Sequence, residues 1–323
     1  MKNIYERMAE SGAEEKKQQF MRLRKLPYDE KVRYAEEIAY SFLEAPEISG
    51  RAYVAVGGLD SITLLLFLRK IGIDVPAISC SNLEDKSIQV IHKQLGVHCL
   101  KSQKTKVEVI QEFGWPVLSK EIAGKIETLQ RPTEKNKTVR HAIITGETGE
   151  FGGYRKSSRM KMANKWLKLF AGYENENEGT DYKTAPFLVS QKCCYYLKEK
   201  PCNDYAKRTG RYPYMGLMAS EGGRRAKTLM MNGCNYISKG TKRSCPFAIF
   251  GRQDLLQLAL DLNVPVPSIY GEIVRDQDGT LRTTKAQRTG CSMCGFGMDY
   301  SQVSGHAFRK NLSRSSCLGL LPV

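Results

Sequence analysis

Two pairs of cysteines in this chain could together hold a metal cluster. Cys193 and Cys194 are adjacent, while Cys291 and Cys294 follow far downstream with two residues between them. Four thiolates at these spacings suit a cubane iron–sulfur cluster, because its irons occupy separate corners and neighbouring sulfurs can each bind their own iron. A single tetrahedral zinc ion would strain the chain between adjacent cysteines, so zinc is the less favoured metal.

A glycine turn near the start of the chain could bind phosphate. The sequence Gly57-Gly58-Leu59-Asp60-Ser61 lies between a β-rich run at 51–56 and an apolar segment of helix length at 62–71. Because glycines permit close approach, the backbone at Gly57 and Gly58 can wrap a phosphate. Asp60 could hold Mg²⁺ on the phosphates, and Ser61 could cap the helix or donate to a phosphate oxygen. An ordinary tight turn is the alternative.

The segments around the glycine turn predict an α/β fold. Residues 4–43 carry apolar positions at helical spacing and predict two or three helices, with Pro27 separating the first two. Expected strands at 51–56, 75–80 and 97–100 alternate with expected helices at 62–71, 86–95 and 107–113. This alternation predicts a Rossmann-like parallel sheet with helices on both faces, and ligands at the carboxyl ends of its strands.

Three ranges follow from the order of these features. We expect basic N-terminal helices over 1–50, a nucleotide-binding domain over 51–186, and an iron–sulfur and substrate-anion region over 187–323. A polar segment near 133–183, with clustered glycines and an acidic stretch, is expected to be a mobile insertion or a lid.

Composition places the chain among ordinary globular proteins and limits its location. It has 323 residues, of which 41% are hydrophobic and 26% charged. The first twenty residues lack the apolar core of a secretory signal, and no apolar run is long enough to cross a bilayer, so we expect a cytoplasmic protein without a membrane partner. In that setting, ten cysteines indicate metal binding or redox chemistry more than a disulfide framework.

The charge balance favours a polyanionic partner. Fifty Lys and Arg residues against 34 Asp and Glu residues give a formal net charge of +16. Nucleic acid or a highly charged nucleotide would complement this charge. A solvated basic surface is the alternative.

Several motifs resemble those of known nucleotide enzymes. Val56-Gly57-Gly58-Leu59-Asp60-Ser61 resembles the Ser-Gly-Gly-x-Asp-Ser loop of the PP-loop adenine nucleotide alpha-hydrolase superfamily, with Val56 in place of the first serine. The tandem-cysteine segment 192–201, the segment 288–297 around Cys291 and Cys294, and the acid-and-arginine segment 218–225 are similar to motifs of the phosphoadenosine phosphosulfate (PAPS) reductase family, iron–sulfur type. The resemblance spans residues 52–298.

The resemblance implies a set of cofactors and site residues. It implies a [4Fe-4S] cluster on Cys193, Cys194, Cys291 and Cys294, for which Cys234 or Cys245 could replace one tandem cysteine. It also implies an adenine nucleotide, ATP or another, with Mg²⁺. Arginine forms paired bonds with sulfate and phosphate, and the expected anion-binding residues are Arg224, Arg225, Arg288 and Lys120, with Glu221 orienting an arginine. Cys80, Cys99, Cys202 and Cys317 are expected to be packing residues.

Three functions stay open at this point. The first is ATP-dependent, pyrophosphate-releasing thiolation of an acceptor such as a nucleic acid, with a partner protein supplying sulfur or reductant. The second is reduction of the sulfonucleotide PAPS. The family's Glu-Cys-Gly-x-His tail is absent, since the chain has Ser316-Cys317-Leu318 near its end, and this departure counts against reduction. The third is a non-catalytic, nucleotide-sensing regulator associated with DNA.

Overall fold

The computed structural model describes residues 12–80, 84–147, 160–171, 187–291 and 294–296. It divides the chain into two compact units, each built from separate segments. The first unit comprises Met1–Ser102 and Lys198–Ser292, and the second comprises Gln103–Leu197 and Met293–Val323. The ranges expected from the sequence follow the order of motifs, whereas these units join segments that lie far apart in the chain.

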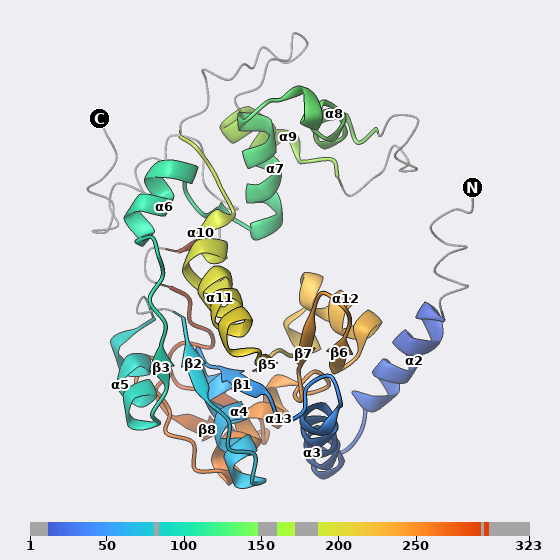
Figure 1. Cartoon of the computed structure of the whole chain (residues 1–323), viewed down its shortest axis with the longest axis vertical. Coiled ribbons are helices and arrows are strands. Elements are labelled where there is room, and N and C mark those ends of the chain that lie inside the picture. Colours follow the sequence, from blue (N-terminus) through green and yellow to red (C-terminus); the bar gives the residue numbers. More distant parts are fainter. Residues whose placement is uncertain (1–11, 81–83, 148–159, 172–186, 292–293, 297–323) are drawn as a thin grey trace. The chain divides into compact units, whose positions relative to one another are not determined.

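The first unit contains a six-stranded, mostly parallel sheet. Its strands are β1 (Ala52–Ala55), β2 (Ala77–Ser79), β3 (His98–Cys99), β5 (Tyr212–Met215), β6 (Asn235–Ile237) and β7 (Lys242–Ser244). The strand order is β3-β2-β1-β5-β7-β6, which runs from left to right in Figure 1. Four neighbouring pairs are parallel, and only β6 runs antiparallel to β7. The predicted parallel α/β sheet is confirmed.

Strand β1 shows how helices cover both faces of this sheet. Successive side chains of a strand point to opposite faces. Val54 is fully buried in the main hydrophobic core together with Leu64 of α4 (Leu59–Lys70). Tyr53 points the other way, where its ring meets Tyr205 of α11 (Lys200–Thr209) edge-on, with 5.2 Å between the ring centroids. The expectation of a Rossmann-like sheet with helices on both faces is therefore confirmed.

The remaining elements of the first unit pack around the same core. They are α2 (Ala13–Leu23), α3 (Tyr28–Glu44), α5 (Lys86–Gln94), η5 (Ala219–Glu221), α12 (Gly223–Asn232), α13 (Arg252–Asp261) and the hairpin β8 (Ile273–Arg275) and β9 (Leu281–Thr283). Helix α3 buries Ala35, Ala39 and Phe42, spaced so that they share one helical face. The Tyr214 hydroxyl of β5 donates to the Ala39 carbonyl at 2.6 Å and ties this helix to the sheet.

The second unit is mainly helical and has its own core. Its elements are α6 (Lys106–Phe113), β4 (Val117–Leu118), α7 (Lys120–Gln130), η1 (Glu134–Asn136), α8 (Lys137–Thr145), α9 (Asn164–Trp166), η2 (Leu167–Ala171), α10 (Lys192–Cys194) and β10 (Gly295–Phe296). The π-helix η4 (Tyr195–Glu199) leads from this unit into α11. Strand β10 pairs in parallel with β4, which brings the segment after Cys294 beside Val117.

The expected polar insertion near 133–183 falls in this second unit. Its described residues form helices η1, α8, α9 and η2, while 148–159 and 172–186 lie outside the described residues, as does Cys317. Within the described part of the chain, no helix combines the length and apolar composition needed to cross a membrane.

Candidate functional site: an acid–arginine group beside the glycine turn

The glycine turn lies where the order of the strands reverses. From β1 the chain continues to β2 and β3 on one side, and it later returns as β5 on the other side of β1. In such sheets, ligands bind outside the carboxyl ends of the two strands that flank this switch point. Gly57–Ser61 follows β1 and Gly216 follows β5. The two segments touch, because a Cβ at Gly216 would lie 3.0 Å from the Asp60 carbonyl oxygen.

Ser61 fixes the shape of the turn. The Gly57 amide donates to Ser61 Oγ at 2.7 Å, and Ser61 Oγ lies 3.0 Å from the Gly58 carbonyl oxygen, to which it donates. Ser61 does not cap the helix, because the residue at the cap position of α4 is Gly58 and no side chain there accepts a capping hydrogen bond; the serine instead closes the turn before the helix. A phosphate oxygen that accepts a hydrogen bond from the Gly57 amide would take the place of the Ser61 hydroxyl.

Gly58 is required by close packing. A Cβ at this position would overlap the Tyr270 hydroxyl and lie 3.3 Å from Thr289 Oγ1. Those two hydroxyls are 2.7 Å apart, and the Leu59 amide donates to the Tyr270 hydroxyl at 3.2 Å. Tyr270 thus holds the start of α4 against the segment that precedes Cys291.

His92 supports the turn from behind, and sequence patterns did not single it out. Its Nε2 lies 2.7 Å from the Gly57 carbonyl oxygen, and only 6% of the residue is exposed. Burial lowers the pKa of His92, although the bond to Gly57 and the charge of Glu84 act in the opposite direction. A carbonyl can only accept, so the neutral ring must carry its proton on Nε2.

We expect His92 to make the stability of the protein depend on pH. Because its folded pKa is depressed, the unfolded chain binds more protons, and the free energy of unfolding falls as the pH drops below about 6.5. His92→Gln retains an N–H donor without a titrating ring and should reduce this loss. Urea unfolding at several pH values measures it. His98→Gln, at an exposed position of β3, is the control and should leave the pH dependence unchanged.

Acidic and arginine side chains gather beside the turn. Arg252 Nη1 lies 2.8 Å from Asp60 Oδ1, and Arg288 Nη2 lies 3.2 Å from Glu221 Oε1. Arg225 also pairs with Glu221, whose side chain is 8% exposed. Burial raises the pKa of Asp60. The positive charges of Arg252 and Arg288 oppose this shift, and the negative charge of Glu221 adds to it. These residues form the acid–arginine group.

The two exposed arginines of this group can reach a ligand. The side chains of Arg225 and Arg288 are 56% and 63% exposed, although both pair with the buried Glu221. The carboxylate holds them by one edge and leaves other guanidinium donors free for an anion. The expectation that Glu221 orients an arginine agrees with both ion pairs. Arg252 was missed because only the fold brings α13 beside the turn.

Other expected anion-binding residues are placed differently. Arg224 belongs to α12, but its side chain lies outside the described part of the structure. Lys120 is the first residue of α7, in the second unit, and its side chain is exposed. Their roles stay predictions.

The tandem cysteines lie on α10 in the second unit, together with Cys294 before β10. Glu127 fixes the segment that leads into α10. It accepts from Ser190 Oγ at 3.0 Å and from the Gln191 amide at 3.2 Å, and its other oxygen lies 3.4 Å from Lys192 Nζ. One partly buried carboxylate therefore positions the residues just before Cys193.

Removal of the Glu127 charge should loosen this segment. Glu127→Ala leaves donors from Ser190, Gln191 and Lys192 without their acceptor, and each charged hydrogen bond contributes about 1.5–3 kcal/mol. We expect Cys193, now 8% exposed, to react several-fold faster with iodoacetamide, as peptide mass spectrometry would show. Glu121→Ala, on the solvent side of the same helix, should leave the rate unchanged. Equal rates in both variants would contradict this role.

The other expected metal ligands lie in the first unit. Cys291 is a neighbour of Lys198, whose Nζ lies 2.6 Å from Glu84 Oε1. Cys234 and Cys245 are buried in the main core, and burial raises their pKa values to about 11 and about 12. Among the described residues, no three His, Cys, Asp or Glu side chains are grouped to hold a metal ion. The [4Fe-4S] cluster stays a prediction.

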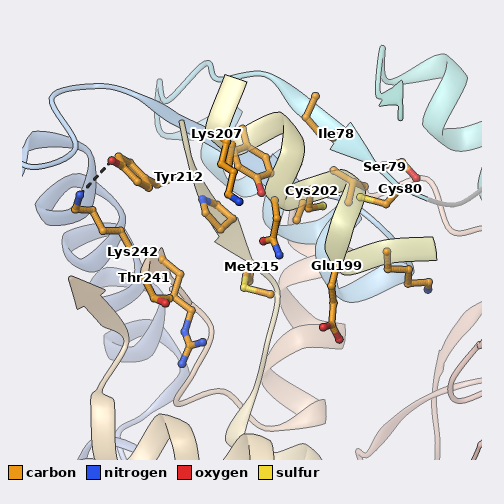
Figure 2. A pocket seen from close by; sticks show the side chains of 18 of the residues that line it. Ile78, Ser79, Cys80, Glu199, Cys202, Lys207, Tyr212, Met215, Thr241 and Lys242 are labelled. Atoms are coloured by element: carbon orange, nitrogen blue, oxygen red, sulfur yellow. Dashed lines mark hydrogen bonds between the residues drawn. The ribbon is translucent and has the colours of Figure 1, made fainter. Parts of the chain in front are cut away.

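A cavity of about 840 Å³ opens beside Gly57 within the first unit. Its walls come from β1, from the ends of β2 and β5, from the segment before β7, and from α11 (Figure 2). Tyr212 and Lys242 lie on one side, with the lysine Nζ 3.1 Å from the tyrosine hydroxyl. Cys80 and Cys202 lie on another. A volume of this size is typical of small-molecule sites.

Comparisons with known proteins include a distant structural similarity. No family model and no curated protein match the chain. Among solved structures, the chain is similar to a phosphoadenylyl-sulfate (PAPS) reductase from Candida auris, in a phosphate complex. The identity is 12% and the TM-score 0.38, over 81% of this chain and 95% of that chain. A similarity this distant carries no argument about function.

Proposed function

We propose that the first unit binds the phosphates of an adenine nucleotide between the glycine turn and the acid–arginine group, and uses it in sulfur transfer. One observation carries this proposal. The turn and the arginines, which are far apart in the sequence, meet at the switch point of a parallel sheet. Backbone donors, a helix start and guanidinium groups are together the usual means of holding phosphate.

The residues of the group would have distinct tasks. Arg225 and Arg288, held by Glu221, would bind phosphate or sulfate oxygens and stabilise charge that develops on them. Asp60 would hold Mg²⁺, or it would orient Arg252 so that this arginine binds a further oxygen of the anion. The sulfur chemistry is supported by the sequence motifs around Cys193 and Cys291. ATP-dependent thiolation, with release of pyrophosphate, is the version that these motifs and the turn favour.

A second version is favoured by the pairing of Asp60. Its carboxylate already binds Arg252 at 2.8 Å, and Glu221 already binds two arginines. Carboxylates neutralised in this way fit an anion held by arginines better than a divalent cation, which needs free carboxylate oxygens. This arrangement favours a sulfonucleotide such as PAPS, which can bind without Mg²⁺.

Competitive binding of ATP and PAPS to the anaerobic full chain, with and without Mg²⁺, tests the proposal. Preferential, Mg²⁺-dependent binding of ATP supports thiolation. Displacement of ATP by PAPS regardless of Mg²⁺ supports the sulfonucleotide version. If neither nucleotide binds, the proposal is wrong. Asp60→Asn separates a catalytic from a regulatory role. If this variant still binds nucleotide and still supports the cellular phenotype, the phenotype does not depend on catalysis.

The acceptor that we propose is a nucleic acid. The chain carries a net charge of +16, and basic side chains lie over aromatic rings near the cavity. Lys242 Nζ lies 4.6 Å from the ring centroid of Tyr212, and the Arg243 guanidinium carbon lies 5.5 Å from the ring centroid of Tyr236. Such pairs can stack bases and bind phosphates. Binding of tRNA or DNA should weaken steeply with salt, and salt-independent binding would contradict this acceptor.

A further inference from the structure

Two thiols of the cavity form a pair that the sequence does not suggest. Cys80 follows β2 and Cys202 lies in the first turn of α11, and both side chains line the same cavity. Figure 2 shows both side chains on the same side of the cavity. Neither thiol is fully buried, so a ligand in the cavity can reach them.

We propose that Cys80 and Cys202 are a redox-active dithiol that reduces a small anionic disulfide bound in the cavity. This activity is separate from nucleotide binding and does not require it. The cavity offers the disulfide a wall of mixed but mainly positive charge. Its charged lining residues are four basic side chains, Lys198, Lys207, Lys242 and Arg243, and two acidic ones, Glu84 and Glu199.

The surroundings of the pair assign different roles to its members. A hydrogen bond from the Cys80 thiol lowers the pKa of Cys202. Burial opposes this effect, while the Tyr53 hydroxyl and the Lys198 charge reinforce it. The hydrogen bond to Cys202 and burial raise the pKa of Cys80. The Lys198 charge opposes this shift, and Cys99 adds a small contribution to it. The thiolate is the nucleophile in exchange reactions. Cys202 is therefore the attacking sulfur and Cys80 the resolving one.

The exchange proceeds in two balanced steps. The Cys202 thiolate attacks one sulfur of the disulfide, the S–S bond of the substrate breaks, and the first thiolate leaves and takes the proton from Cys80. Cys80 then attacks Cys202 Sγ and expels the second thiolate, which takes a proton from water. Two protein thiols are oxidised to the Cys80–Cys202 disulfide, and the substrate is reduced to two thiols.

The exposed Cys99 provides a matched control. It lies on β3 beside β2, paired with Ser79, but it does not line the cavity. Cys99→Ser should therefore behave as the wild type. Cys80→Ser should stop at a mixed disulfide on Cys202, and Cys202→Ser should leave Cys80 unmodified over the same time.

Oxidised glutathione, an anionic disulfide, is the probe, and cystamine is its cationic counterpart. The full-length reduced protein is treated with each, quenched by alkylation and mapped by peptide mass spectrometry. We expect a linked Cys80–Cys202 peptide in the wild type and in Cys99→Ser, formed several-fold faster with oxidised glutathione than with cystamine. A stable mixed disulfide on wild-type Cys202, or linkage of Cys80 to Cys99, would overturn the proposal. The wild-type map decides this even if a variant fails to fold.

Discussion

Replacement of Gly58 with alanine is expected to weaken nucleotide binding at least tenfold and to destabilise the first unit. The added Cβ would overlap the Tyr270 hydroxyl, and that hydroxyl also accepts from the Leu59 amide at the start of α4. Forcing one extra carbon into a packed site costs about 1–3 kcal/mol. The glycine turn would have to shift, and the phosphate-binding backbone would shift with it. Urea unfolding and ATP titration measure the two effects.

Removal of the obstructing hydroxyl tests the cause. Tyr270→Phe alone should cost about 1 kcal/mol, because it removes the bonds to Leu59 and Thr289. Combined with Gly58→Ala, it should restore part of the lost stability, since the two positions are in contact and their effects are not additive. Gly240→Ala is the control, because a Cβ at Gly240 meets nothing within 4 Å. Strictly additive losses in the double variant would show that the Tyr270 hydroxyl is not the obstacle.

Arg252→Ala should have the second large effect. It removes a guanidinium from the acid–arginine group and leaves the Asp60 carboxylate without its 2.8 Å partner. We expect nucleotide affinity to fall about tenfold or more, because a charge-assisted bond to phosphate contributes about 1.5–3 kcal/mol. The accompanying loss of stability should be smaller, about 1 kcal/mol, because both side chains are 28% exposed.

The pH dependence of this loss provides an internal check. Without Arg252, burial keeps the pKa of Asp60 raised with less opposition, and the protonated acid needs no cationic partner. The destabilisation by Arg252→Ala should therefore be greater at neutral pH than in acid. Arg282→Ala removes an exposed ion pair with Asp276 and is the matched control, which should change neither stability nor affinity appreciably. Equal nucleotide affinities in the two variants would contradict the role of Arg252.

The turn could be predicted from the sequence because its signals are local. A β-rich run, two glycines and a long apolar segment are contiguous, and the structure has β1, the turn and α4 in that order. The helices at the N-terminus were equally predictable from spacing, and Pro27 separates α2 from α3 as expected. Short elements such as β4, with two residues, carry too little pattern to be predicted.

The contacts that complete the site are long-range and could not be predicted. Arg252 approaches Asp60 only because α13 packs beside α4, and His92 approaches Gly57 only because the fold brings α5 to the turn that follows β1. Cys80 and Cys202 were expected to be packing residues because each is isolated from other candidate ligands in the sequence. The sheet and α11 bring the two thiols together in a cavity, which no local pattern indicates.

Hydrogen–deuterium exchange of the anaerobic full chain, with and without a saturating adenine nucleotide, tests most directly where the phosphates bind. The proposed site predicts slower exchange of backbone amides over 56–62 and 216–222, the segments that follow β1 and β5, and loss of this protection in Arg252→Ala. Protection confined to other segments, with these two unchanged while the nucleotide is bound, would contradict binding at the switch point.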